Sequence, residues 1–206
     1  KTEVWYVLSA EPGAALYYGF NREITKDEYR RRIADNTITE VLNRVEAKAG
    51  DVFFIKPGTV HAIGSGLMIC EIQQNSNTTY RVYDYDRRGA DGKPRELHID
   101  KAVDVSVLAP SDQADSSGKT QQMDGYTLRL IAKCKYFTTE RIEVSDKAVL
   151  EVDRESFRSV IVTDGCAKIK MNEAELDVKK GDSVFVPAQS GNIEIDGSCG
   201  IFLSYV

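Results

Sequence analysis

Several residue types that often identify a class of protein are scarce in this chain. Its 206 residues include two histidines and four cysteines, and no two cysteines form a CxxC pair. Disulfide-stabilised secreted domains carry denser cysteines in shorter chains. We therefore expect reduced, mostly buried thiols and a cytoplasmic location. The cysteines are Cys70, Cys134, Cys166 and Cys199.

Positive charge and long apolar segments are also lacking. The formal net charge is -5, which gives no electrostatic reason to bind nucleic acid or an anionic membrane surface. No apolar run approaches the ~20 residues that a membrane-spanning helix needs. We expect neither nucleic acid nor a membrane among the partners of this protein, and the sequence does not specify an oligomeric state.

The start of the chain lacks two further features, an initiator methionine and a signal-peptide pattern. Residues 1–8 already have the composition of a strand. We therefore expect that the natural protein has further residues before Lys1.

Short segments rich in Val, Ile, Phe and Tyr are abundant, and turns containing Gly, Asp, Asn and Ser separate them. This pattern predicts an all-β fold, either a sandwich or a closed barrel. The expected strands are residues 4–8, 15–18, 52–55, 67–72, 79–84, 126–134, 137–144, 159–163, 167–171, 183–186 and 201–205.

One region departs from the strand pattern. Residues 25–28 and 37–40 each place a threonine three residues before a glutamate, which is the capping box that begins a helix. Apolar residues follow each box at helical spacing. We predict two short helices inserted near residues 25–45. The three consecutive arginines at 30–32 are interpreted as a solvated face of this insertion.

A polar segment divides the chain. Residues 110–125 have little apolar content, which is typical of a linker or surface loop. We therefore predict two β domains, residues 1–109 and residues 126–206.

A weak internal repeat supports two related domains. Residues 50–57 and 181–187 both begin with Gly-Asp, continue through a β-rich strand and end at proline. The first copy is followed by His61, whereas the second has no histidine after its proline. A site built on His61 is therefore not repeated in the second domain.

His61 is the most informative single residue. Pro57 and Gly58 form a tight corner between two strands, because proline cannot donate to a sheet and glycine tolerates unusual backbone angles. His61 follows this corner at the start of the next strand, so its ring is directed at one defined position. This placement suits a metal ligand, and the alternative is a packed core histidine.

Three motifs carry a family resemblance: Lys1-Thr-Glu-x-Trp-Tyr, Pro57-Gly-Thr-Val-His-Ala-Ile63 and Glu71-Ile-Gln-Gln-Asn-Ser-Asn-Thr-Thr-Tyr-Arg-Val-Tyr-Asp-Tyr85. They closely resemble type I mannose-6-phosphate isomerase in its short bacterial form, over at least residues 1–110 and more loosely over the second domain. The resemblance implies two tandem cupin domains, each a double-stranded β-helix or jelly roll. It also implies a zinc-dependent enzyme that interconverts mannose 6-phosphate and fructose 6-phosphate.

The resemblance further implies roles for single residues. Glu3 and His61 match two zinc ligands, Arg81 matches the catalytic arginine, and Lys1 matches a lysine that carries protons. The family's remaining two ligands, a Gln-x-His pair, would lie before Lys1. We therefore expect one Zn²⁺ per catalytic domain in the whole protein, and weak or absent zinc in the 206 residues alone.

The reaction itself assigns tasks to these residues. Aldose–ketose isomerisation needs a polarised carbonyl, a stabilised enediolate and a proton carrier whose pKa lies near the working pH. Lys1 and Glu71 are both candidates for the proton carrier. A guanidinium within a barrel strand is costly unless it meets an anion, which favours a catalytic Arg81. The alternative is a structural salt bridge from Arg81 to Glu71 or Asp84.

The expected partner is a small sugar phosphate, whose phosphate group needs cations. Four cations flank a glycine-containing loop and could reach the phosphate: Arg87, Arg88, Lys93 and Arg95. Of these, Arg87 and Arg95 are the candidates. His98 is left without a role.

Two other functions remain open. A non-catalytic sugar-binding or regulatory cupin could keep the barrel and lose the metal site, although such a protein would not need Glu3, His61 and Arg81 together. A metal-dependent dioxygenase of the same fold would need several neighbouring histidines, and His61 is the one usable candidate.

Overall fold

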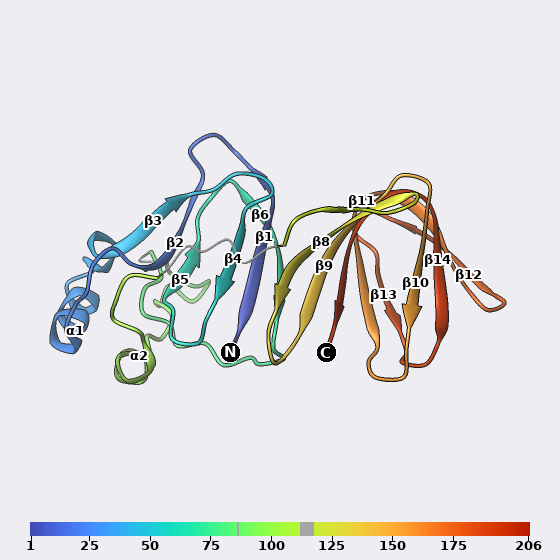
Figure 1. The fold of residues 1–206 in the computed structure, drawn as a ribbon. Helices are drawn as coiled ribbons and strands as arrows, with labels where there is room; N and C mark the ends of the chain where they lie inside the picture. Colours follow the sequence, from blue (N-terminus) through green and yellow to red (C-terminus); the bar gives the residue numbers. More distant parts are fainter. Residues whose placement is uncertain (86, 112–117) are drawn as a thin grey trace. The chain divides into compact units, whose positions relative to one another are not determined.

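The computed structural model describes residues 1–85, 87–111 and 118–206. The chain divides into two compact units, residues 1–114 and residues 115–206, and each is described by itself (Figure 1). Both units are mostly β-structure, which confirms the expected fold class.

Unit 1 contains six strands, two α-helices and one 3-10 helix within its described residues. In chain order they are β1 (Glu3–Ala10), β2 (Ala15–Phe20), α1 (Lys26–Ala34), η1 (Ile38–Glu40), β3 (Leu42–Glu46), β4 (Val52–Ile55), β5 (His61–Ile63), β6 (Leu67–Gln73) and α2 (Ile99–Val105).

Two three-stranded antiparallel sheets form the body of unit 1, with strand orders β4-β1-β6 and β3-β2-β5. Side chains from β1, β2 and β4 meet in a shared core, so the two sheets pack against each other. This core contains Trp5, Val7, Leu16, Tyr18, Phe53 and Ile55.

Helix α1 begins as its capping box predicts. The Thr25 hydroxyl accepts a hydrogen bond from the Glu28 backbone N–H at 3.1 Å. Such a cap satisfies one of the donors that a helix start leaves without a partner. Tyr29 and Ile33 on the buried face of α1 pack with Phe20 from β2 and Val103 from α2, so both helices cover one end of the β3-β2-β5 sheet.

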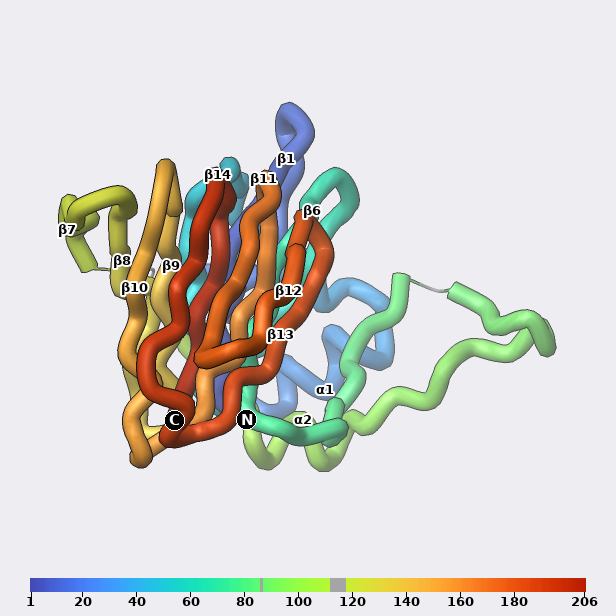
Figure 2. The backbone as a smooth tube through the Cα atoms, turned by 90° about the vertical axis from the view of Figure 1, so that its right-hand side faces the viewer, coloured from blue at the N-terminus to red at the C-terminus, as the bar shows by residue number. Residues whose placement is uncertain are grey.

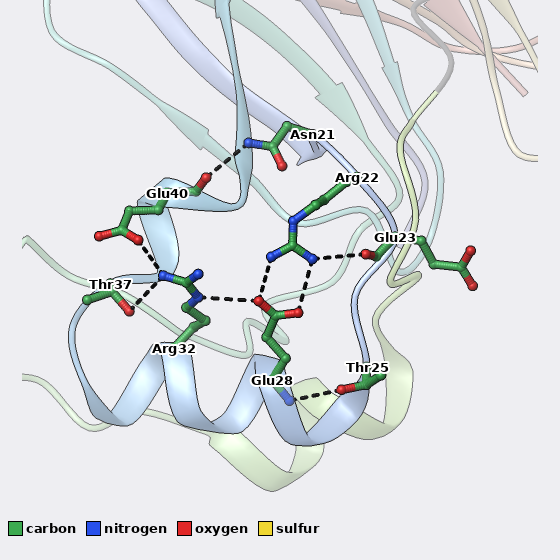
Figure 3. A network of polar contacts seen from close by, with 8 residues as sticks. All are labelled: Asn21, Arg22, Glu23, Thr25, Glu28, Arg32, Thr37 and Glu40. Carbon is green, nitrogen blue, oxygen red and sulfur yellow. Dashed lines mark hydrogen bonds and ion pairs between the residues drawn. The ribbon is translucent and has the colours of Figure 1, made fainter.

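An ion-pair network holds α1 to the segments on either side of it (Figure 3). Arg22 forms a bidentate pair with Glu28, at 3.0 and 2.6 Å. Arg32, one turn beyond Glu28 on the same helix, pairs with both Glu28 and Glu40. Arg30 is paired as well, with Asp27 and Asp100. The arginine run is therefore a solvated face on which Arg30 and Arg32 have local acidic partners.

The second predicted helix is wrong beyond its first turn. Thr37 makes no capping hydrogen bond, and η1 is a single 3-10 turn. The apolar residues that follow form β3, in which Val45 pairs with Leu16 and Leu42 pairs with Phe20. Pairing with a buried neighbouring strand has overridden a local helical spacing.

The strand predicted at residues 79–84 is also wrong. The pairing of β6 with β1 ends where Gln73 meets Glu3, so the chain beyond it has no neighbouring strand to pair with in the described structure. A segment of high β-propensity forms a strand only where a partner is available. Val82 and Tyr83 pack instead against the cluster of buried side chains that contains Phe20, Tyr29 and Val103.

Helix α2 was not predicted because its start carries no capping signal. Its N-cap residue is His98, whose side chain makes no capping hydrogen bond. Neither α1 nor α2, the α-helices of the described ranges, has the length and apolar content of a membrane span.

Unit 2 consists of strands. In chain order they are β7 (Gln121–Gln122), β8 (Tyr126–Lys133), β9 (Thr138–Val144), β10 (Lys147–Val152), β11 (Arg158–Met171), β12 (Ala174–Lys179), β13 (Ser183–Val186) and β14 (Gly191–Tyr205). The short strand β7 lies within the segment predicted as a linker, and residues 112–117 of that segment lie outside the described residues.

Two long paired strands, β11 and β14, organise unit 2, and they run side by side in Figure 2. The first half of β14 also pairs with β10, and its second half pairs with β9. In the same way β11 pairs first with β13 and then with β12. Each long strand thus serves two parts of the sheet, which wraps around an aliphatic core rich in valine and isoleucine.

The long strands change direction at glycines. Gly165 and Gly197 have φ values of 68° and 140°, and a Cβ on Gly197 would lie 2.9 Å from the Ala167 Cα. The two strands predicted at 159–163 and 167–171 are therefore one continuous element, β11.

All four cysteines are free thiols.

Candidate active site

One face of the β4-β1-β6 sheet gathers the polar residues of the first and third motifs. Residues directly opposite each other in neighbouring antiparallel strands share a face. Glu3 is opposite Gln73, and Trp5 is opposite Glu71. Strand pairing therefore brings Glu3, Glu71 and Gln73 together, although some 70 positions separate them in the sequence. Glu3 is 2 % exposed.

His61 reaches the same place from the other sheet. It is the first residue of β5 and pairs with Tyr18 of β2. Its ring meets the Trp5 ring edge-on, with centroids 5.1 Å apart. Its Nε2 lies 3.6 Å from Glu3 Oε1. The expected convergence of Glu3 and His61 is therefore present in the structure.

The corner before His61 is held from outside by α2. Gly58 has a φ of 88°, and a Cβ there would lie 2.7 Å from the Val105 carbonyl oxygen. The Val107 backbone N–H donates to the Gly58 carbonyl at 2.9 Å. Glycine is thus required both by its backbone angle and by close approach of the chain that leaves α2.

The His61 ring is oriented by a single hydrogen bond. Nδ1 lies 2.8 Å from the Thr59 carbonyl oxygen, which can only accept, so Nδ1 carries the proton. Nε2 then presents its lone pair toward Glu3. Burial lowers the pKa of His61, which favours the neutral ring. A neutral imidazole with its second nitrogen bound to a carbonyl is the usual state of a metal ligand.

Lys1 lies between the two carboxylates. Its Nζ is 3.5 Å from Glu3 Oε2 and 3.9 Å from Glu71 Oε1, and it donates to Gln73 Oε1. Burial raises the pKa of Glu71, and the adjacent Glu3 carboxyl raises it further through a hydrogen bond and through its charge. Glu71 is therefore more readily protonated than an ordinary glutamate.

A cleft of about 740 Å³ joins these groups to the arginines predicted from the sequence. Lys1, Glu3, His61 and Glu71 line it together with Arg81, Arg87 and Arg95. Its volume is in the range of small-molecule sites. The structure thus brings Lys1, Glu3, His61, Arg81, Arg87 and Arg95 to one cleft, and it leaves their chemical roles as predictions.

Arg81 is fixed by its neighbours but is not in the predicted strand. Its backbone N–H donates to His98 Nδ1 at 3.1 Å, and its carbonyl accepts from the His98 N–H at 2.8 Å. One guanidinium nitrogen donates to the Glu96 carbonyl at 3.1 Å. No ion pair within the described ranges joins Arg81 to Glu71 or Asp84, the alternative that the sequence left open. His98 thus has a structural partner in Arg81.

Sequence reasoning missed the importance of Asp84. Its carboxylate is 8 % exposed and pairs with Arg87 at 2.7 Å and with Arg95 through both oxygens. The two guanidinium groups, Arg95 first, hold the pKa of Asp84 well below its ordinary value. The sequence does place Asp84, Arg87 and Arg95 within residues 84–95. This spacing alone does not show which of the arginines in that segment pair with Asp84.

Glu3 and His61 are the residues at this site that were predicted to hold a metal ion. In the part of the chain that the structure describes, no group of three or more His, Cys, Asp or Glu side chains is placed to hold a metal ion. Glu3 and His61 supply two donors, one oxygen and one nitrogen, and this combination is common at zinc.

Comparison with known proteins identifies relatives over the whole chain. Residues 127–206 match the family model "Mannose-6-phosphate isomerase, cupin domain". The chain is 35 % identical over 206 residues to mannose-6-phosphate isomerase ManA of Bacillus subtilis, and 34 % identical over 205 residues to mannose-6-phosphate isomerase of Streptococcus mutans. In each case it is covered completely and spans 64 % of the relative.

The structure also matches solved structures over the whole chain. The crystal structure of mannose 6-phosphate isomerase from Bacillus subtilis matches all of this chain with a TM-score of 0.91 and 32 % identity, and 64 % of that protein is covered. The enzyme from Salmonella typhimurium, bound to fructose 6-phosphate and zinc, shares the fold at a TM-score of 0.69 and 14 % identity.

The relatives and the solved structures match both units of the chain. The family model for the cupin domain matches residues of unit 2 only. A cupin domain in unit 2 is therefore supported directly, and a second cupin in unit 1 stays a prediction. By sequence and by structure, the chain is similar to mannose-6-phosphate isomerases over the 64 % of their length that it spans.

Proposed function

We propose that this chain carries the greater part of the active site of an aldose–ketose isomerase that interconverts mannose 6-phosphate and fructose 6-phosphate. The observation that carries the proposal is the meeting of Lys1, Glu3, His61 and Glu71 in one cleft that Arg81 also lines. Two acids, a lysine, an oriented imidazole and a guanidinium are the groups that proton transfer beside a carbonyl needs.

We propose that Glu3 and His61 are ligands of a Zn²⁺ ion. The fit rests on three features: a buried carboxylate, an imidazole whose Nε2 faces it at 3.6 Å, and a carbonyl that fixes the other ring nitrogen. When bound, zinc would polarise the sugar carbonyl as a Lewis acid. Catalytic zinc usually takes three protein ligands, so two donors alone should bind it weakly.

The transfer of the proton between the sugar carbons is assigned to Lys1 and Glu71. Isomerisation moves a proton between C1 and C2 of the sugar and another between their oxygens. Lys1 Nζ and Glu71 Oε1 lie 3.9 Å apart on the cleft wall, so both groups face the part of the cleft where the proton would be taken up and returned. Arg81 then offers its permanent positive charge to the enediolate that forms between the two proton transfers.

The phosphate group is assigned to Arg87 and Arg95. Both line the cleft, and their side chains are 62 % and 50 % exposed, so their remaining N–H groups are accessible to a ligand. Arginine is the preferred partner of phosphate because its planar N–H groups match two oxygens at once.

The test is to incubate mannose 6-phosphate in D₂O with a zinc-supplied protein that contains this chain and has the length of its relatives. Proton NMR should show fructose 6-phosphate, with deuterium at the carbon that received the proton. Conversion without any deuterium would contradict a solvent-exchanging base. Tight binding of mannose 6-phosphate without conversion would instead favour the non-catalytic sugar-binding cupin.

A further inference from the structure

The cluster formed by Asp84, Arg87 and Arg95 has an unusual charge arrangement. One carboxylate, 8 % exposed, is shared by two guanidinium groups that are mostly exposed. Removing a carboxylate from water is costly unless it is paired and hydrogen-bonded, and here it is paired twice. The cluster keeps a net charge of about +1 and lies in the wall of the cleft.

The contacts define which edge of each guanidinium is used. Arg95 donates from Nε and Nη2, so its side edge faces Asp84. Arg87 donates from Nη2 to Asp84 Oδ1 at 2.7 Å, and from Nε to the Asp84 carbonyl at 3.3 Å. The Nη1 groups of both arginines make no hydrogen bond to any residue in the described ranges. Asp84 therefore holds both side chains and leaves one N–H₂ group on each.

A second contact restricts Arg87 further. Its guanidinium carbon lies 5.7 Å from the centre of the Tyr85 ring. Tyr85 itself has a φ of 53°, and its ring packs against Tyr83 with centroids 4.9 Å apart. A non-glycine residue in this backbone region is uncommon and occurs often at functional sites.

We propose that Asp84 is a positioning residue, which holds Arg87 and Arg95 as a two-armed binding site for the phosphate group of the substrate. The inference rests on the proposed function for the identity of the substrate. The role of Asp84 itself follows from the contacts. Without the carboxylate, two like charges would repel and two flexible side chains would lose the common point that aligns them.

The proposal makes a prediction whose sign differs from that of simple charge counting. Asp84→Asn removes a negative charge from the cleft, so long-range electrostatics alone would tighten the binding of an anion. Loss of alignment weakens it. We expect Asp84→Asn to weaken the binding of inorganic phosphate to the 206-residue chain by roughly tenfold, the loss of about one charge-assisted hydrogen bond. Isothermal titration calorimetry measures this directly.

Asp104→Asn is the matched control. Asp104 also pairs with a cation, Lys26 at 3.3 Å, but it does not line the cleft. This variant removes the same charge from the same unit and should leave phosphate binding unchanged. If Asp84→Asn fails to fold by circular dichroism, Asp84→Glu keeps the charge and displaces it by one methylene, and it should weaken phosphate binding as well.

Kinetics in a zinc-loaded protein of the relatives' length separate positioning from general damage. Asp84→Asn should raise KM for mannose 6-phosphate roughly tenfold and leave kcat within about twofold. Unchanged or tighter phosphate binding, no phosphate binding by the unaltered chain, or equal loss in kcat would each overturn the inference. If phosphate binding falls as expected but the protein never isomerises the sugar, the proposed function fails and the role of Asp84 stands.

Discussion

Gly58→Ala tests whether the corner before His61 depends on close approach of the chain beyond α2. An alanine at a φ of 88° is strained by about 1–2 kcal/mol. Its Cβ would also lie 2.7 Å from the Val105 carbonyl oxygen and 3.0 Å from Val107 Cγ2, so backbone must move. Forced overpacking of this kind costs typically about 1–3 kcal/mol. These terms sum to about 2–5 kcal/mol, and the less flexible unfolded chain offsets about 0.4–1 kcal/mol of this, so we expect Gly58→Ala to destabilise unit 1 by about 1–4.6 kcal/mol.

Gly13→Ala is the control that isolates the contact from the backbone angle. Gly13 has a similar φ of 76°, but a Cβ there meets nothing within 4 Å. It should cost only the strain of the backbone, offset by about 0.4–1 kcal/mol from the less flexible unfolded chain. The difference between the two variants is therefore the contribution of the close approach.

Urea unfolding followed by tryptophan fluorescence measures both variants. The chain has one tryptophan, Trp5, which is 3 % exposed and lies in the core of unit 1, so its emission reports the unfolding of this unit. If Gly58→Ala is no more destabilising than Gly13→Ala, the corner tolerates a side chain. The reasoning that α2 fixes the position of His61 would then be wrong.

Three other predictions concern the site and α1. His61→Ala should remove zinc and isomerisation together in the zinc-supplied protein, and normal metal content by atomic absorption with full activity would refute its assignment as a ligand. Arg81→Ala should lower kcat by about a hundredfold, the effect of losing one preorganised charge, while zinc is retained; unchanged turnover would exclude a catalytic role. Arg22 lowers the pKa of Glu28 from 4.5, chiefly through their hydrogen bond. This pair therefore stabilises unit 1 above about pH 4.5, and the stabilisation is lost as the pH falls through the lowered pKa. Glu28→Gln should therefore flatten the dependence of the urea midpoint on pH below neutrality, and an unchanged pH profile would show that the network contributes nothing.

The strands of unit 1 that could be predicted are those with both a local signal and a partner. Residues 52–55 alternate between partly and fully buried side chains and pair with β1, so pattern and sheet agree. Residues 79–84 are also rich in residues of high β-propensity, but they form no strand. Composition reports that a side chain suits a sheet, but the presence of a neighbouring strand is decided by the rest of the fold.

The helical insertion shows the same limit from the opposite side. Thr25 and Thr37 have equivalent sequence patterns, but the Thr25 hydroxyl alone accepts the hydrogen bond that completes the box. The glutamates of both boxes pair with arginines, Glu28 with Arg22 and Arg32 and Glu40 with Arg32. The glutamate of a capping box thus has competitors that the four-residue pattern does not contain.

The candidate site could be predicted further than the fold around it, because its residues lie in long and specific motifs. Glu3, His61 and Arg81 were selected by motif, and all three line one cleft. Arg81 nevertheless does not lie in the barrel strand that was expected, and its backbone is held instead by two hydrogen bonds, one with the His98 ring and one with the His98 N–H. Asp84 was missed because its value lies in pairing two arginines at once, which no linear spacing defines.

Glu3 and Asp84 are two carboxylates that line the same cleft and have different partners. Both are carboxylates that are less than a tenth exposed, yet Asp84 has two arginines and Glu3 has one lysine at 3.5 Å. A buried carboxylate with a full set of cationic partners is suited to hold other side chains in place. One with a single, longer cationic contact and an imidazole nitrogen facing it keeps oxygen lone pairs available for a further cation. In the proposed mechanism the same charge thus serves alignment at Asp84 and metal binding at Glu3.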